Sequence, residues 1–212
     1  MSSIIYLVRH AESEHNVSKD FTQRDPPLTA TGLGQASTLS ELFPDSASIA
    51  VVFTSPLTRT LQTTTAGFSQ LFHKDGPGGA QLIIDPDLQE RSDLPCDTGS
   101  RSAELRKAFP HFDFGDLEDE WFVKEGLYAA DDATVTERAQ RFRERLRETI
   151  ALLEKDKNGD GDQRRKNVVV ITHGVFMKFL AGDDAIDLPK AGWKAFGLDT
   201  REDRGAVLVP LA

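Results

Sequence analysis

The stretch I-I-Y-L-V-R-H-A-E-S-E-H-N, residues 4–16, joins an apolar run to a polar segment. Residues 4–8 are dense in β-branched and aromatic types, as a buried strand requires. Arg9 and His10 follow at once, so they lie at the carboxyl end of the expected strand, where open α/β sheets bind ligands. A guanidinium grips an oxyanion bidentately, and an imidazole can be a nucleophile near neutral pH. Alone, such a pair is also typical of a polar strand end at a surface.

A second apolar run, residues 49–53, leads into S-P-L-T-R-T-L-Q-T, residues 55–63. A helix is expected to begin there, with Pro56 in its permitted first-turn position. Arg59 then falls in the first turn, at the helix end that carries free N–H groups and the positive end of the dipole. A solvated arginine on a helix surface is the alternative interpretation.

The most strongly β-branched run of the chain, residues 168–171, continues as T-H-G-V. Gly174 permits a tight turn from this strand into a helix expected over residues 175–180. His173 therefore lies at the carboxyl end of a strand, as the Arg-His pair of the opening stretch does. The pattern predicts that these strand ends share one ligand site.

The other expected elements follow from periodicity and from turn residues, and together they predict an α/β fold. The polar, proline-terminated segment 12–27 is expected to be a loop. The remaining expected helices cover residues 29–43, with Thr29 as N-cap, and 134–155; the remaining expected strands cover residues 82–84, 195–198 and 206–209.

The chain is long enough for one well-buried domain, so residues 1–212 are expected to form a single domain. Segment 91–132 has poor periodicity and many turns, and we expect it to be an insertion with a short helix near residues 103–109. Three aromatic residues of the insertion fit either a local core, which we favour, or a wall of a substrate site: Trp121, Phe122 and Tyr128.

The composition limits the classes of function. A net charge of −9 argues against a nucleic-acid partner and against an anionic membrane surface, because both require a basic face. Cys96 is the single cysteine, which excludes an internal disulfide and a thiolate-rich metal site. No apolar run is long enough to span a bilayer, and the N-terminal stretch lacks the features of a signal peptide. We therefore expect a cytoplasmic protein.

Residues 156–162, D-K-N-G-D-G-D, invite comparison with a calcium-binding EF-hand loop. Acidic or amide side chains occupy loop positions one, three and five, and glycine occupies position six. The twelfth position, however, is Asn167 rather than the bidentate glutamate that the site needs, and a strand follows instead of a helix. We expect a flexible turn that binds no calcium.

Three of these segments, residues 7–16, 55–63 and 170–174, resemble in order and spacing the signatures of the histidine phosphatase superfamily, also called phosphoglycerate mutase-like. The resemblance covers nearly the whole chain outside the insertion. It implies a three-layer sandwich: a mostly parallel central sheet of about six strands, helices on both faces, and a small insertion over the active site. The sequence departs from the family pattern at Ala11, where glycine is usual, and at S-D-L-P-C-D-T-G, residues 92–99.

The resemblance also implies a metal-independent and cofactor-free phosphatase that hydrolyses a small phosphomonoester. In that family His10 is the nucleophile that becomes phosphohistidine, and Glu90, in its L-x-E context, is the general acid. A glutamate just beyond a strand usually faces solvent, so Asp87, Asp93 and Asp97 remain candidates for the proton donor. The expected phosphate-binding residues are Arg9, His10, Asn16, Arg59, His173 and Gly174.

Other interpretations stay open. A phosphoglycerate mutase would share these motifs but needs a more basic pocket, and the insertion adds only Arg91 and Arg101 as candidate bases. A non-catalytic or redirected member of the fold is a third possibility. Glu12 and Glu14 are expected to point away from the site, because ionised carboxylates would repel phosphate. The sequence leaves the substrate, the pathway and the oligomeric state open.

Overall fold

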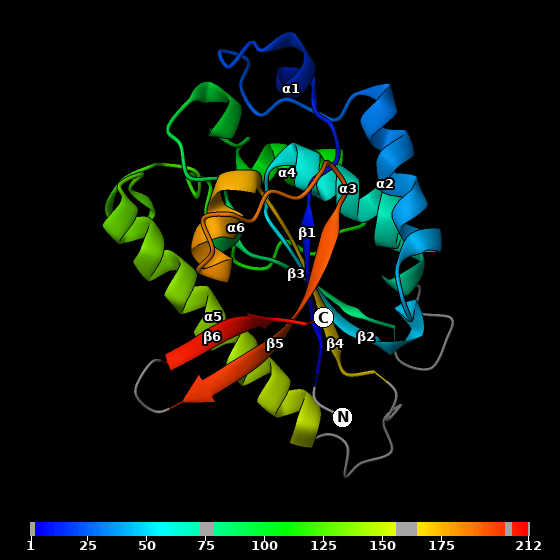
Figure 1. The fold of residues 1–212 in the computed structure, drawn as a ribbon. Helices are drawn as coiled ribbons and strands as arrows, with labels where there is room; N and C mark the ends of the chain where they lie inside the picture. Colours follow the sequence, from blue (N-terminus) through cyan, green and yellow to red (C-terminus); the bar gives the residue numbers. More distant parts are fainter. Residues whose placement is uncertain (1–2, 73–78, 156–164, 202–204, 212) are drawn as a thin grey trace.

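The computed structural model describes residues 3–72, 79–155, 165–201 and 205–211, in which six strands form one sheet with the order β3-β2-β4-β1-β5-β6 (Figure 1). β1 and β4 are parallel neighbours at its centre, β2 and β3 continue it in parallel, and β5 and β6 close the other side in antiparallel fashion. The predicted α/β fold with a mostly parallel sheet is confirmed. The strands are β1 (Ile5–Arg9), β2 (Ile49–Thr54), β3 (Gln81–Ile84), β4 (Asn167–Thr172), β5 (Trp193–Arg201) and β6 (Gly205–Pro210).

Helices cover both faces of the sheet, as predicted. Side chains of β1 alternate between the faces: Ile5 and Leu7 belong to one apolar cluster, and Tyr6 and Val8 belong to the other. The first cluster is completed by α5 and α6, and the second by α2 and the end of α3. These helices are α2 (Ala30–Leu42), α3 (Thr58–Phe68), α5 (Asp132–Lys155) and α6 (Gly174–Ala181).

Two local predictions are wrong. The segment expected to be a loop contains α1 (Glu14–Ser18), in which the N-cap Ser13 and the side chain of Asn16 form a reciprocal capping box. A helix this short has no apolar period, so only its caps mark it in the sequence. Helix α3 begins at Thr58, with Leu57 as N-cap, so Pro56 precedes the helix; Arg59 keeps its place in the first turn.

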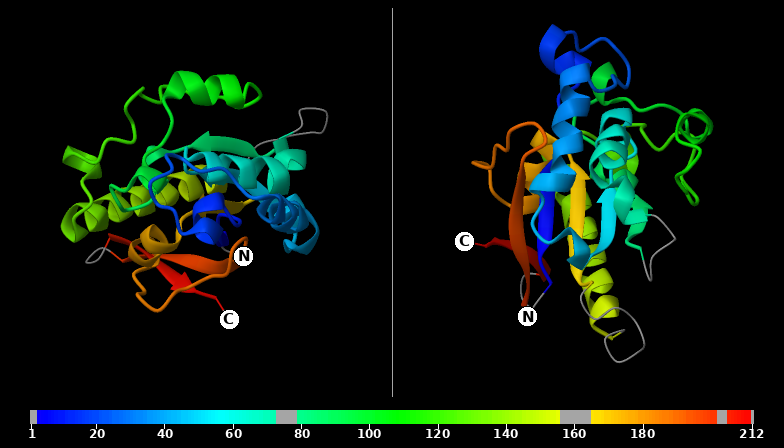
Figure 2. Two further views of the ribbon diagram at one scale, coloured as in Figure 1. Left: turned by 90° about the horizontal axis from the view of Figure 1, so that it is seen from above. Right: turned by 90° about the vertical axis from the view of Figure 1, so that its right-hand side faces the viewer.

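Segment 91–132 packs a small apolar cluster of its own against the start of α3. Trp121 and Phe122 are buried in this cluster with Leu57 and Leu61, which confirms that both belong to a local core; Tyr128 is half-buried outside it. The left view of Figure 2 shows the helix of this segment standing apart from the sheet. The segment holds α4 (Ser102–Ala108) and 3₁₀ helices at Pro95–Asp97 and Gly126–Tyr128; other 3₁₀ helices lie at Ser46–Ser48, Ser69–Phe72 and Pro86–Leu88.

No helix in the described ranges is long and apolar enough to cross a membrane. The turn at residues 156–162 that we compared with a calcium loop lies outside the described residues, and its twelfth position, Asn167, begins β4.

Candidate active site

The strand ends identified in the sequence meet at one edge of the sheet. Arg9 is the register partner of Thr172, and the backbone N–H of His10 donates to the carbonyl of Thr172 at 3.0 Å. The N–H of Ser55, just after β2, donates to the carbonyl of Ile171 at 3.1 Å. The rings of His10 and His173 consequently lie 5.2 Å apart, measured between centroids.

A cavity of about 620 Å³ opens at this edge. It contains the predicted residues Arg9, His10, Asn16, Arg59, Glu90 and Gly174 among its walls, while His173 is fully buried beside His10. The cavity walls are completed by two lysines and by much of segment 91–97: His15, Phe21, Arg91, Ser92, Asp93, Leu94, Cys96, Asp97, Ala130, Val175, Lys178, Asp187 and Lys190.

His10 is held in one tautomer. Its Nδ1 lies 2.7 Å from the carbonyl oxygen of Ala11, and because a carbonyl can only accept, Nδ1 carries the proton. The lone pair is then on Nε2, the atom that can attack. Burial, followed by the charge of Arg59, lowers the pKa of His10 well below 6.5, so the imidazole is neutral at pH 7.

His173 begins α6 as its N-cap residue. Its Nε2 lies 2.9 Å from Oγ of Ser55, and its Nδ1 is buried without a hydrogen-bond partner among the described residues. Burial, followed by the charge of Arg59, lowers its pKa well below 6.5. At Gly174 an added Cβ would lie 2.9 Å from Nη2 of Arg9, so glycine at this position lets the guanidinium approach the turn.

Both arginines are already paired with carboxylates. Arg59 is only 1% exposed, and it donates to Oδ1 of Asp97 at 2.8 Å and to the carbonyl of Cys96 at 2.7 Å. Arg9 donates to Oδ1 of Asp187 at 2.9 Å and to the carbonyl of Leu188. Asp97 lies in the stretch where the sequence departs from the family pattern; the hydroxyl of Ser92 orients it at 2.6 Å.

Glu90 lies at the N-terminal turn of α6. Oε1 accepts from the N–H groups of Phe176 and Arg91, each at 2.8 Å, and Oε2 accepts from the N–H of Val175 at 3.0 Å. These bonds satisfy free donors of the helix end and fix the carboxylate in the wall of the cavity. Behind it, Nζ of Lys124 donates to the carbonyl of Glu90 at 2.6 Å, and burial lowers the pKa of this lysine to about 7.

Asn16 is oriented by a chain of hydrogen bonds. Its Oδ1 accepts from the N–H of Ser13 at 3.2 Å and from the hydroxyl of Ser13 at 2.9 Å, which fixes the orientation of the amide. Nδ1 of His15 must then donate to that hydroxyl oxygen, and Nε2 of His15 accepts from Nδ2 of Asn16. Burial, followed by the charge of Arg59, lowers the pKa of His15 to about 4, so the ring stays neutral. One amide N–H of Asn16 remains for a ligand.

The site residues whose roles the sequence did not show include His15, Asp97, Asp187 and Lys190. The turn that holds Lys190 is hydrogen-bonded to the backbone of the nucleophile: the N–H of Ala191 donates to the carbonyl of His10 at 3.3 Å. Burial, followed by the charges of Arg9 and Arg59, lowers the pKa of Lys190 to about 8. A lysine in a short turn carries no periodic signal, so the sequence offers no means of finding it.

Ala11, Glu12 and Glu14 follow the nucleophile in the sequence, and none of the three belongs to the cavity walls as the structure describes them. Ala11 is fully buried, belongs to an apolar cluster with Leu28 and Ala36, and is not among the described residues that line the cavity. Its methyl group therefore does not narrow the site. Glu12 and Glu14 accept hydrogen bonds from Thr29 and Gln23, respectively, outside the cavity walls, which agrees with their expected direction.

Of the other candidate acids and bases, some line the cavity and others lie away from it. Arg91 lines the cavity, whereas Arg101 is ion-paired with Asp119 away from it. Asp87 is buried in an ion pair with Arg141, so of the three alternative proton donors only Asp93 and Asp97 are in the cavity walls. Within the described ranges, no group of three or more His, Cys, Asp or Glu side chains is placed to hold a metal ion.

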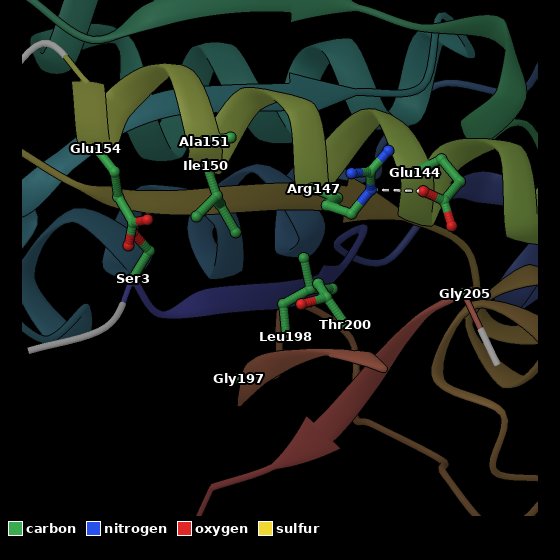
Figure 3. A pocket seen from close by; sticks show the side chains of 10 residues that line it. All are labelled: Ser3, Glu144, Arg147, Ile150, Ala151, Glu154, Gly197, Leu198, Thr200 and Gly205. Atoms are coloured by element: carbon green, nitrogen blue, oxygen red, sulfur yellow. Dashed lines mark hydrogen bonds and ion pairs between the residues drawn. The ribbon is translucent and has the colours of Figure 1, made fainter. Parts of the chain in front are cut away.

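A second cavity, of about 590 Å³, lies between α5 and the β5–β6 hairpin (Figure 3). It contains none of the predicted site residues among its described walls. Glu144, one of its charged residues, is ion-paired with Arg147 at 2.7 Å and accepts the N–H of Ala206 at 2.9 Å. Its size matches that of the cavity at the strand ends, but it has no comparable set of buried histidines and arginines among the residues described.

Comparison with known proteins agrees with this geometry. A sequence model of the histidine phosphatase superfamily (branch 1) matches residues 5–202. A probable phosphatase of Schizosaccharomyces pombe is 33% identical over 196 residues, covering 88% of this chain and 83% of that protein. Phosphoglycerate mutase-like protein 1 of Arabidopsis thaliana is 27% identical over 206 residues, covering 82% of this chain and 68% of that protein. A solved mycobacterial glucosyl-3-phosphoglycerate phosphatase, in complex with VO3, superposes with a TM-score of 0.60 at 16% identity, covering 100% of this chain and 98% of that one, which shows a shared fold.

Proposed function

The chain belongs to the histidine phosphatase superfamily (branch 1), and we propose that it is a phosphatase that hydrolyses a small phosphomonoester through a phosphohistidine on His10. The observation that carries the proposal is the tautomer of His10. Its Nδ1–H is bound to the carbonyl of Ala11, which leaves Nε2 unprotonated in a cavity that also holds Arg9 and Arg59.

In the first step, Nε2 of His10 attacks phosphorus in line with the leaving oxygen. The N–P bond forms while the P–O bond to the leaving group breaks, and Glu90 gives a proton to the departing oxygen, so an alcohol or phenol leaves. Negative charge is spread over the three equatorial oxygens in the transition state, and preorganised donors stabilise it. The proposed donors are the side chains of Arg9, Asn16, Arg59 and His173 and the backbone at Gly174.

In the second step, water attacks the phosphorus of phosphohistidine. Glu90, now ionised, takes the proton of the water, the N–P bond breaks, and the electron pair returns to Nε2 of His10. Inorganic phosphate leaves and Glu90 is protonated again, so both groups are restored. Positive charge comes from side chains throughout, and we therefore propose that no metal takes part. A cytoplasmic location belongs to the same proposal.

A phosphoglycerate mutase is the second candidate, because several relatives carry phosphoglycerate mutase or mutase-like names. In addition, Lys178 and Lys190 make the cavity more basic than the insertion alone would. Hydrolysis is favoured, since the relative named as a phosphatase is matched over 88% of this chain, whereas relatives named as phosphoglycerate mutases with a higher identity are matched over only 41% to 43% of it. Arg101 also stays outside the cavity walls. A non-catalytic role is disfavoured because the nucleophile and both arginines are retained in one cavity.

The test is a screen of phosphomonoesters for release of inorganic phosphate, followed by a trapping experiment on the best substrate. A substrate with a labelled phosphoryl group should leave acid-labile, base-stable label on the wild-type protein and none on His10→Ala. Isomer formation that needs a bisphosphate primer and releases no phosphate would instead identify a mutase. If no substrate is turned over and no label is trapped, the proposal is wrong.

A further inference from the structure

We propose that Lys190 is a further phosphate ligand of this site, with its ammonium group contacting the phosphoryl oxygens beside His10. The inference rests on the proposed function and adds a residue to it. Three observations support it: the hydrogen bonds that hold the turn at residues 189–192, the ion pairs of the arginines in the cavity, and the effect of the charge of Lys190 on the pKa values of the nearby histidines.

The turn at residues 189–192 fixes where Lys190 lies. The N–H of Gly192 donates to the carbonyl of Pro189 at 2.9 Å, and Ala191, the third residue of the turn, has a positive φ of 57°. A residue with a Cβ adopts this conformation at an energetic cost, so the surrounding structure must hold it there. It does so on both sides, since the N–H of Ala191 donates to the carbonyl of His10 and the N–H of Arg9 donates to the carbonyl of Gly192 at 3.0 Å.

The side chain of Lys190 is therefore half-buried in the cavity wall, next to the nucleophile in space although 180 residues away in the chain. An exposed lysine on an unconstrained turn would have no desolvation cost for its charge. A lysine held beside two buried histidines by three backbone hydrogen bonds is an arrangement that favours a bound anion.

The pairing of the other cations shows why the anion needs Lys190. Asp97 neutralises Arg59, Asp187 neutralises Arg9, and Asp132 neutralises Arg91. The ammonium of Lys190 forms no hydrogen bond or ion pair with any side chain that the structure describes. A phosphate dianion that enters the cavity consequently meets guanidinium groups that are already ion-paired. The two lysines of the wall, Lys178 and Lys190, supply charge without an ion pair among the described residues, and of these Lys190 belongs to the turn that is hydrogen-bonded to His10.

The electrostatics of the neighbouring groups agree with this placement. The charge of Lys190 contributes to the lowered pKa values of His10, His15 and His173, which agrees with the place of its turn beside the nucleophile. The pKa of Lys190 is itself lowered to about 8, first by burial and then by Arg9 and Arg59, while the charge of Glu90 opposes this lowering and that of Lys19 adds to it. Cations that destabilise one another in the free protein are stabilised together when an anion binds between them.

The test compares three variants. Lys190→Met removes the charge and keeps most of the length of the side chain, and Lys190→Arg keeps the charge. Lys194→Met is the matched control, because Lys194 is also half-buried, lies four residues further along, and is not among the described residues that line the cavity. We expect kcat/KM of Lys190→Met to fall on the order of 10²-fold, the usual effect of losing one transition-state donor. Lys190→Arg should retain most activity, and Lys194→Met should match the wild type.

A pH profile separates contact with phosphate from a structural role of the turn. The kcat/KM of the wild type should fall as pH rises through about 8, because Lys190 loses its proton there. Lys190→Arg should keep its activity through that range, since a guanidinium stays protonated. If Lys190→Met fails to fold, the comparison of wild type with Lys190→Arg still decides the matter.

Calorimetric binding of vanadate makes the result independent of turnover. Lys190→Met should bind vanadate at least about tenfold more weakly than the wild type, the scale of one lost charge-assisted hydrogen bond. Equal vanadate affinity and equal kcat/KM in the wild type and Lys190→Met would overturn this inference alone. Vanadate binding that depends on Lys190 in a protein that hydrolyses no phosphomonoester would overturn the proposed function and leave the anion site standing.

Discussion

At the scale of single residues, one hydrogen bond determines what His10 can do. Its Nδ1–H is held by the carbonyl of Ala11, so protonation of the ring must occur at Nε2, the attacking atom. Burial lowers the pKa of His10 well below 6.5, and the neutral form therefore persists below that pH. Since protonation removes the lone pair, activity on the acid side of the profile is lost as pH falls through this lowered pKa.

We predict that the acid limb of kcat/KM lies below pH 6.5. The profile should be corrected for the second ionisation of the substrate phosphate, which has a pKa of about 6. The profile should also be measured with a second substrate that has a different leaving group. An acid limb caused by ionisation of the protein will have the same midpoint pH with both substrates. An acid limb at or above pH 6.5 that is common to both substrates would contradict the assigned environment of His10.

Substitutions of His10 and of Glu90 should impair catalysis in different ways. His10→Ala has no nucleophile, so turnover should vanish for every substrate. Glu90→Gln keeps the nucleophile and both arginines but loses the proton donor. Alkyl phosphates, which need that proton, should slow by about 10²–10⁴-fold, the usual contribution of general acid catalysis. An aryl phosphate needs it less, so phosphohistidine should form on Glu90→Gln and accumulate.

The measurement is the ratio of alkyl to aryl turnover together with trapped phosphoenzyme. Equal slowing of both esters, with no label trapped, would mean that Glu90 is not the acid. The donor would then be Asp93, because Asp87 and Asp97 are both held in buried ion pairs, with Arg141 and Arg59 respectively.

The residues that the sequence revealed are those at the ends of recognisable strands. Arg9, His10 and His173 each follow an apolar run whose direction and end are visible in the sequence, and Arg59 follows another across a short turn. Asp97 and Lys190 lie in turns without any period. Their roles come from how those turns pack against β1 and α3, which is a tertiary property that no local pattern contains.

At the scale of elements, the start of α2 supports the loop that carries the nucleophile. Thr29 caps the helix by accepting from the N–H of Gly32 at 2.9 Å, and its hydroxyl donates to the carboxylate of Glu12 at 2.7 Å. A Cβ added at Gly32 would lie 1.9 Å from the carbonyl oxygen of Glu12, so helix and loop are in direct backbone contact. The same helix contains Gly34, where an added Cβ would meet nothing within 4 Å.

We predict that Gly32→Ala lowers the free energy of unfolding by about 1–3 kcal/mol, the usual effect of overpacking, and also lowers kcat/KM because the displaced Glu12 backbone is two residues from His10. Gly34→Ala is the matched control and should raise the free energy of unfolding by about 0.5–1 kcal/mol through helix propensity, with activity unchanged. Urea denaturation and steady-state kinetics give both quantities. Two alanine variants of equal stability and activity would show that this contact does not constrain the loop.

Elements with a strong hydrophobic period could be predicted from the sequence. A short capped helix and the direction of a strand could not. Helix α5 appears in the sequence because its apolar side chains recur every three or four residues, and β4 appears because it is continuously β-branched. The capped turn of α1 has no such period. Strand direction is not expressed in a period of two, which is why β5 and β6 were expected as strands while their antiparallel pairing was not.

At the scale of the whole molecule, a chain of net charge −9 concentrates cations in one cavity. Because those cations are side chains, we predict that phosphate release from an aryl phosphate needs no added metal and is unchanged by a chelator. The assay should include a metal-dependent phosphatase as a positive control for chelation. Loss of most activity with the chelator, restored by one divalent cation, would contradict the prediction.

The central position of β1 has a consequence for how the protein is made. β1 pairs with β4 on one side and β5 on the other, and the N–H of Ile4 is bound by Asn167, 163 residues away. At about 5–20 residues per second, a ribosome needs on the order of 8–30 s to reach β4 after finishing β1. During that interval β1 is apolar and complete, and neither of the strands that pair with its two edges has been synthesised. The nascent chain therefore cannot assemble its active site until β4 and the turn that holds Lys190 have both been synthesised.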